Sequence, residues 1–101
     1  MDSSFESAVA VIGAGSYGTA LAFVLARNGN RTMLWGRDEN HVRAMQDTRT
    51  NEKYLPAATF PDALSVTNNL EEAVQSARDI LVVVPSHAFK ETLVAVQRLF
   101  Q

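Results

Sequence analysis

Cysteine is absent from the sequence, which excludes disulfide bonds and thiolate-bound metal sites. Long apolar runs are absent too, so no segment is expected to span a membrane. Residues 1–7 lack the basic region and apolar core of a secretory signal, and we therefore expect a soluble cytoplasmic protein. The formal net charge is only −2, and no basic stripe or arm favours a nucleic-acid partner. His41 and His87 have no partners at ligand spacing, so we expect no metal site.

Three glycines follow a short apolar strand that the sequence predicts over residues 8–12. Gly13, Gly15 and Gly18 form the pattern G-x-G-x-x-G, and an Ala/Leu-rich helix is expected after it, over residues 17–28. In a dinucleotide-binding turn, the first glycine permits the tight turn, the second lets the backbone approach a pyrophosphate, and the third lets the helix pack on the sheet. The unpaired N–H groups of the helix start then face the phosphates. The alternative is an ordinary glycine-rich turn without a ligand.

The rest of the chain alternates between strand and helix patterns. With 101 residues, 47% of them hydrophobic, it can form one domain with a modest core. Right-handed crossovers predict an α/β fold, the first four strands of a Rossmann-type doubly wound parallel sheet in the order 3-2-1-4. The predicted strands cover residues 8–12, 31–36, 64–67 and 80–84; the helices begin near residues 17, 39, 70 and 86; and residues 48–62 form a loop.

Local signals predict where several helices begin or end. Gly29 stands where a left-handed C-terminal cap belongs. Asp38 is suited to cap the second helix, and Asn69 followed by Glu72 resembles a capping box at the start of the third. Ser86, directly after a proline, is expected to cap the last helix.

The predicted strand over residues 80–84 is wholly apolar, yet the order 3-2-1-4 leaves it at an edge. Soluble proteins avoid uncharged apolar edges because such strands pair with other chains. We therefore expect a further strand to cover it. On this interpretation, residues 1–7 are a flexible tail and residues 8–101 are the truncated N-terminal cofactor-binding domain of a longer protein, without its substrate domain.

Four segments together resemble one family of enzymes. They are GAGSYGTALA at residues 13–22, LWGR at 34–37, NEKYLP at 51–56 and VVVPSHAF at 82–89. In this order, they are similar to the NAD(P)-dependent glycerol-3-phosphate dehydrogenases, the bacterial type in particular. The first segment is common to many Rossmann proteins, whereas the third and fourth are much more specific.

The resemblance implies hydride transfer between a nicotinamide cofactor and the pair glycerol 3-phosphate and dihydroxyacetone phosphate, for phospholipid synthesis. It also implies that Ser16 and Tyr17 lie at the pyrophosphate turn and Arg37 near the adenosine ribose. Pro85 and Phe89 would pack against the cofactor beyond the fourth strand. The family's catalytic lysine would lie past the end of this sequence, so we expect no catalytic residue here and no activity from this chain alone. A homodimer is expected for the full-length protein.

Two of these aromatic residues also have purely structural interpretations. Tyr17 could simply pack at the start of its helix. Phe89 could belong to an apolar face of the last helix, together with Leu93, Val96 and Phe100 at helical spacing.

Other interpretations of the loop and of the function stay open at this point. Tyr54 is more consistent with an anchor of its loop than with a lid residue, and His87 with a solvated helix start than with a general base. Another two-domain dehydrogenase, of the 3-hydroxyacyl-CoA or 6-phosphogluconate type, would have the same kind of N-terminal domain. An NAD(H)-sensing regulatory domain would bind the cofactor without chemistry.

The choice between NADP and NAD depends on neighbouring residues after the second strand. An acidic residue there binds the ribose 2′-hydroxyl of NAD, whereas an arginine accommodates the 2′-phosphate of NADP. Arg37 and Asp38 provide both types, but neighbours in an extended segment point to opposite faces. Because Asp38 is suited to cap the next helix, Arg37 is expected to face the ribose, and NADPH is favoured. The alternative for Arg37 is a solvated surface charge.

Overall fold

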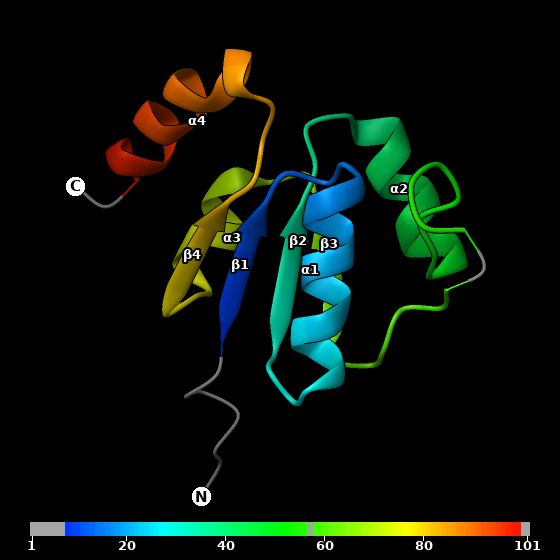
Figure 1. The fold of residues 1–101 in the computed structure, drawn as a ribbon. Helices are drawn as coiled ribbons and strands as arrows, with labels where there is room; N and C mark the ends of the chain where they lie inside the picture. The colour runs from blue at the N-terminus through cyan, green and yellow to red at the C-terminus, as the bar shows by residue number, and fades with distance from the viewer. Residues whose placement is uncertain (1–7, 57, 100–101) are drawn as a thin grey trace, which may run out of the picture.

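Parallel strands form a single sheet with helices on both of its faces (Figure 1). The computed structural model describes residues 8–56 and 58–99, so the tail predicted over residues 1–7 lies outside the described part. The predicted α/β class and the order 3-2-1-4 are confirmed, since the strands run in the order β3-β2-β1-β4. Their bounds are β1 Val9–Ile12, β2 Thr32–Trp35, β3 Leu64–Thr67 and β4 Asp79–Val82, and the helices are α1 Ser16–Arg27, α2 Glu39–Thr48, α3 Leu70–Gln75 and α4 Ser86–Arg98.

The two faces of the sheet are buried under different helices. On one face, Val11 of β1 and Leu34 of β2 are register partners and share a core with side chains of α1 and α2. On the other face, Ala10 and Ile12 pack against Ala73 of α3. Burial on both sides explains why β1 is continuously apolar instead of alternating with polar residues.

The helix starts predicted at Asp38 and Asn69 are confirmed. The Asp38 carboxylate accepts from the N–H groups of Asn40 at 2.9 Å and His41 at 3.3 Å. The Asn69 side chain accepts from the N–H of Glu72 at 3.1 Å. Each bond satisfies an N–H group that has no partner inside its own helix.

The helices are short, and α4 is the longest in the described part at 13 residues. Among the described residues, no helix combines the length and apolar character that crossing a membrane requires. After α1, the chain turns at Gly29, whose φ of +95° confirms the left-handed conformation predicted there.

The fourth strand ends earlier than its apolar sequence predicts. We expected residues 80–84, but β4 covers Asp79–Val82. The N–H of Val83 still donates to the carbonyl oxygen of Ile12 at 2.8 Å, and the chain then leaves the sheet. Within the described residues, β4 pairs with β1 alone and Leu81 is 38% exposed, which agrees with its predicted edge position.

The start and the buried face of α4 also differ from the prediction. Pro85 occupies the N-cap position and Ser86 is the first helical residue, so the expected cap by the Ser86 side chain is wrong. The helix buries Thr92 and Val96, whereas Phe89 is 43% exposed. Of the face that we expected, Val96 is buried but Phe89 is not, because the stripe that contacts the rest of the protein runs through Thr92.

We predict that Asp38→Ala lowers the free energy of unfolding by about 1 kcal/mol, because two N–H groups of α2 lose their acceptor. Denaturant titration followed by circular dichroism measures the loss. Asp47→Ala is the matched control, since it removes an exposed carboxylate from the opposite end of the same helix. Equal losses in the two variants would contradict a specific contribution of the Asp38 cap.

Candidate functional site

The candidate site lies where the carboxyl ends of β1, β2 and β4 meet. The chain connects β1 to β2 on one side, while β4 lies on the other side of β1, so the strand order reverses at this point. In open parallel sheets, ligands bind in the crevice at such a switch point. Gly13 begins the turn here, and its N–H donates to the carbonyl oxygen of Trp35 at 2.9 Å.

The three glycines of the turn have different surroundings. Gly13 has a φ of +129°, and a Cβ there would overlap the carbonyl oxygen of Val83. A Cβ on Gly18 would overlap the carbonyl oxygen of Gly13, so the fold itself requires both glycines. Gly15 has a φ of −80°, which any residue adopts, and a Cβ there would meet nothing within 4 Å. The fold does not need Gly15, and the open space beside it is where a ligand can approach the backbone.

The start of α1 is free to bind an anion. Its first turn has no acidic residue, and Gly15 at the N-cap provides no side-chain acceptor. Within the described part of the chain, no backbone carbonyl accepts from the N–H groups of Gly15, Ser16 or Tyr17. By contrast, α2 and α3 are capped by Asp38 and Asn69 and carry acidic residues in their first turns. The positive end of the α1 dipole is thus uncompensated, as in phosphate-binding helices.

A hollow of about 190 Å³ opens beside the turn. Ligand pockets typically have volumes of roughly 300–1,000 Å³, so this hollow accommodates only part of a dinucleotide. A second hollow shares Gly15 and Pro85 with the first and continues along the start of α1. Of the predicted site residues, the first hollow is lined by Gly13, Gly15, Arg37 and Pro85, and the second by Gly15, Ser16, Tyr17, Gly18 and Pro85.

The segment after β2 presents Arg37 and Asp38, which have different partners. The Arg37 guanidinium lies 3.4 Å from the carboxylate of Glu91 on α4, and their side chains are 74% and 76% exposed. The sequence could not reveal Glu91 as a partner of Arg37, because it lies 54 residues away. An exposed ion pair contributes at most about 1 kcal/mol, so a ligand can readily displace Glu91. Asp38 is already bound to the start of α2.

The backbone at Arg37 is more firmly held than its side chain. The amide of Asn68 donates to the carbonyl oxygens of Gly36 at 3.3 Å and Arg37 at 3.0 Å. The carbonyl oxygen of Asn68 in turn accepts from the indole N–H of Trp35 at 3.0 Å. The position of Arg37 is therefore defined while its guanidinium remains at the surface.

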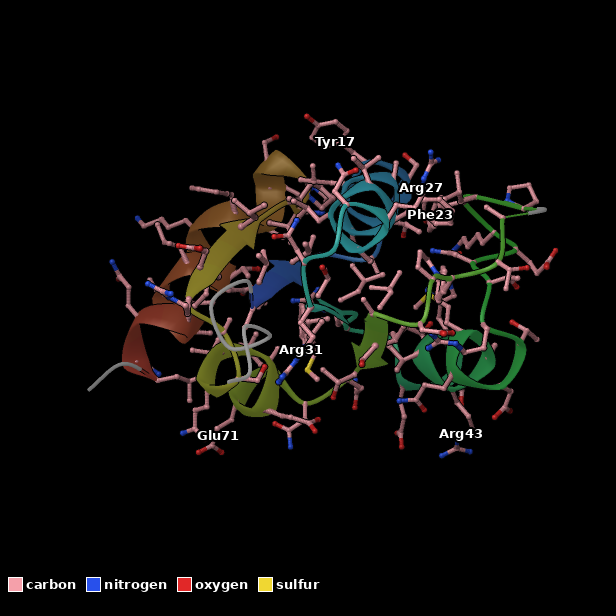
Figure 2. All side chains as sticks on the ribbon, turned by 90° about the horizontal axis from the view of Figure 1, so that it is seen from below. Tyr17, Phe23, Arg27, Arg31, Arg43 and Glu71 are labelled. Carbon is pink, nitrogen blue, oxygen red and sulfur yellow. The ribbon has the colours of Figure 1, made fainter. Side chains whose placement is uncertain are left out.

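Tyr17 points outward from the start of α1 (Figure 2). Tyr17 is 73% exposed, so the interpretation that it packs at the helix start is wrong. Ser16 is exposed as well. Both side chains are accessible to a ligand at the turn.

Phe89 lies apart from the other predicted site residues. It lines neither hollow, and its 43% exposure contradicts the interpretation that it belongs to the core. Val96, from the same predicted face, is buried, while Phe100 lies outside the described residues. His87 lies in the first turn of α4, where it is exposed, as expected for a solvated helix start, and it also lines the first hollow.

The loop between α2 and β3 is anchored beside the glycine turn. The ring of Tyr54 lies edge-on to His41, with centroids 6.0 Å apart, as expected for an anchor of the loop. Sequence reasoning missed Asn51, which is fully buried and donates to the Thr19 hydroxyl at 2.8 Å. The one available signal was its position at the start of the NEKYLP segment.

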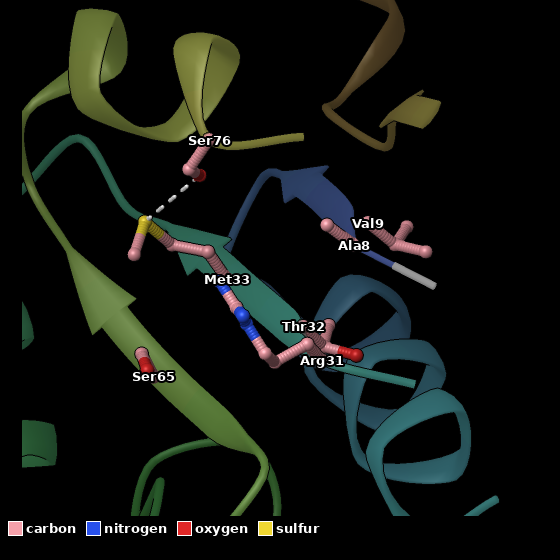
Figure 3. A pocket seen from close by; sticks show the side chains of 7 residues that line it. All are labelled: Ala8, Val9, Arg31, Thr32, Met33, Ser65 and Ser76. Atoms are coloured by element: carbon pink, nitrogen blue, oxygen red, sulfur yellow. Dashed lines mark hydrogen bonds between the residues drawn. The ribbon is translucent and has the colours of Figure 1, made fainter. Parts of the chain in front are cut away.

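A separate small cavity of about 110 Å³ lies at the amino ends of β1 and β2, opposite the glycine turn (Figure 3). The Ser76 hydroxyl donates to the sulfur of Met33 at 3.7 Å on its wall. Its position at the far end of the strands separates it from the candidate site. Among the described residues, no group of three or more His, Asp or Glu side chains could hold a metal ion.

Residues 8–101 match the family described as the N-terminus of NAD-dependent glycerol-3-phosphate dehydrogenase. The chain belongs to this family. Its described residues correspond to the N-terminal region of this family, as the four sequence segments indicated, and the other two dehydrogenase types are set aside.

Individual relatives agree with this assignment. The glycerol-3-phosphate dehydrogenase (NAD(P)+) of Colwellia psychrerythraea is 57% identical over 90 residues, which cover 89% of this chain and 27% of the relative. That of Klebsiella pneumoniae is 48% identical over 98 residues, covering 97% and 29%. The solved glycerol-3-phosphate dehydrogenase of Coxiella burnetii superimposes with a TM-score of 0.89 at 43% identity, covering 94% of this chain and 29% of that one. The chain thus spans between a quarter and a third of the length of these relatives.

We predict that Gly15→Val abolishes NADPH binding and leaves the fold intact, because the new side chain extends into open space that a pyrophosphate would need. Calorimetry with NADPH measures binding, and thermal unfolding measures stability. Gly13→Ala is the contrasting variant: it should lower the unfolding temperature, since its Cβ meets the Val83 carbonyl. Unchanged affinity in the Gly15 variant would mean that the turn has only a structural role.

Proposed function

We propose that this chain binds the dinucleotide of an enzyme that interconverts glycerol 3-phosphate and dihydroxyacetone phosphate. The observation that carries the proposal is the open position at Gly15, beside an uncapped helix start. Family membership supports the identity of the reaction. The nicotinamide group would supply the hydride chemistry, and the residues of this chain would bind and orient the cofactor.

Each part of the turn has a proposed role in binding. Gly15 leaves room for the pyrophosphate, and the free N–H groups at the start of α1 donate to its oxygens. Ser16 and Tyr17, both exposed, contact the same group from the helix side. Pro85 lines both hollows and packs against the cofactor. Phe89, which lines neither hollow, would contact the cofactor where it extends past α4.

Arg37 is the proposed determinant of NADPH preference. Oδ1 of Asp38 accepts from two N–H groups of α2, so this carboxylate is turned toward its own helix and is engaged as its cap, unlike the acidic residue of an NAD site, which accepts from the ribose 2′-hydroxyl. The Arg37 guanidinium pairs with an exposed carboxylate, that of Glu91, and its planar, permanently charged group suits a phosphate. Both arguments favour a 2′-phosphate at this position.

The chemical step itself requires residues beyond this chain. We propose that the catalytic lysine and the groups that bind the substrate phosphate belong to the remaining part of the full-length protein. Its role in phospholipid synthesis, its cytoplasmic location and its homodimeric state stay predictions. The direct test is oxidation of NADPH that depends on dihydroxyacetone phosphate, assayed in the complete natural protein that contains this sequence.

We predict that Arg37→Ala weakens NADPH binding by about 1.5–3 kcal/mol and leaves NADH binding nearly unchanged, because only NADPH offers a phosphate to the guanidinium. Calorimetry with each cofactor measures the two affinities. Glu91→Gln is the matched control, since it releases Arg37 from its partner and should not weaken NADPH binding. Equal losses for both cofactors would contradict the assignment, and so would a change of preference in Asp38→Ala.

A further inference from the structure

Asn51 connects the loop between α2 and β3 to the glycine turn. Its residue is fully buried, although its side chain is polar. The amide nitrogen donates to the hydroxyl of Thr19 at 2.8 Å and to the carbonyl oxygen of Ala14 at 3.4 Å. Thr19, 32 residues away in the sequence, lies in the first turns of α1, and Ala14, 37 residues away, lies inside the glycine turn.

The orientation of this amide follows from its backbone partners. Its oxygen accepts from the N–H of Tyr54 at 3.3 Å, and a carbonyl oxygen such as that of Ala14 can only accept. The ring nitrogen Nε2 of His41, 3.0 Å from the same amide oxygen, therefore donates to it. Both donors and both lone pairs of Asn51 are used, which is the full capacity of an asparagine side chain.

The backbone of Asn51 is itself held in place. Its backbone carbonyl oxygen accepts from the N–H of Leu55 at 2.7 Å. It also lies 3.2 Å from the N–H of Tyr54, which is shared between this oxygen and the side-chain oxygen, and these bonds close a tight turn. On the preceding side, the Arg49 guanidinium donates to the carbonyl oxygen of Pro61 at 2.9 Å. The amide thus extends toward α1 from a hydrogen-bonded turn.

Two contacts of Asn51 act on the groups that would face a pyrophosphate. A peptide unit is planar and trans, so the Ala14 carbonyl and the Gly15 N–H point in opposite directions. Because Asn51 donates to the Ala14 carbonyl, the Gly15 N–H points away from Asn51. Within the described residues, no backbone carbonyl accepts from this N–H. The second contact holds the side chain of Thr19, whose own N–H closes the first turn of α1 on the Gly15 carbonyl at 2.9 Å.

We propose that Asn51 is a positioning residue for the pyrophosphate: it fixes the Ala14–Gly15 peptide and the first turn of α1 in the orientation that binds phosphate. This rests on the proposed function, in which a dinucleotide binds at the turn. It also gives the NEKYLP segment a role, because that loop connects α2 to the phosphate site. Asn51 touches no cofactor atom in this role and acts through Ala14 and Thr19.

The test compares a ligand that contains the pyrophosphate with one that lacks it. NADPH contains it, whereas adenosine 2′-monophosphate carries only the adenine, the ribose and the 2′-phosphate. Asn51→Asp keeps the shape and the acceptor for His41 and Tyr54 but loses both donors. We expect it to weaken NADPH binding about tenfold and to leave 2′-monophosphate binding within about twofold. Calorimetry on the full chain measures the first affinity and NMR titration the second.

A second pair of variants removes the effect of the added charge. Thr19→Val replaces the buried hydroxyl with a methyl group of similar size and should weaken NADPH binding about threefold. Thr19→Ser keeps the hydroxyl and is the matched control. It should bind NADPH with the affinity of the unmodified protein. These variants also provide the answer if Asn51→Asp does not fold.

The outcomes separate this inference from the proposed function. If the unmodified protein fails to bind NADPH, the proposed function is wrong and this inference falls with it. If the unmodified protein binds, unchanged NADPH affinity in Thr19→Val and in folded Asn51→Asp would overturn the positioning role alone. Equal losses for both ligands would overturn it as well, because they would show a general structural effect. The positioning role is supported if Asn51→Asp and Thr19→Val lose affinity for NADPH alone and Thr19→Ser keeps it.

Discussion

The close approach of three backbone segments around Gly13 is the constraint on which the site depends. The segment after β4 places the Val83 carbonyl against Gly13, and α1 places Gly18 against the Gly13 carbonyl. A single methyl group at either glycine would separate these segments. Because they meet this closely, α1 begins directly at the carboxyl edge of the sheet. Gly15 lies between them with no atom near its missing Cβ, so two glycines serve the fold and one leaves room for a ligand.

Features determined by neighbouring residues could be predicted from the sequence. The caps at Asp38 and Asn69 and the left-handed Gly29 each depend on bonds or backbone angles within a few residues. The strand order followed from the handedness of parallel crossovers, which leaves few topologies for four alternating units. The glycine spacing identified the turn for the same reason, since each glycine acts on the backbone next to it.

Features determined by distant contacts could not be predicted in this way. The apolar run continues through Val84, yet β4 ends at Val82 because the Val83 carbonyl meets the glycine turn instead of a neighbouring strand. Helical spacing alone made the face at Phe89 as suitable as the one at Thr92, and only the packing of α4 selected the second. The Arg37–Glu91 pair and the Asn51 network are similarly non-local, and no pattern within either segment reveals the partner.

The described helices divide into two pairs according to whether a side chain caps the N–H groups at their N-termini. Helices α2 and α3 have capping side chains and acidic first turns, whereas α1 and α4 have neither, with Gly15 and Pro85 at their N-caps. A capping side chain stabilises a helix by about 1 kcal/mol, and the fold lacks this stabilisation at the starts of α1 and α4. Gly15 and Pro85 line the same hollow, beside the turn where we propose that the pyrophosphate binds. In the function that we propose, the phosphate supplies the negative charge and the acceptors that the start of α1 lacks. Ligand binding then also completes the cap of α1, and the same N–H groups couple cofactor affinity to the stability of the fold.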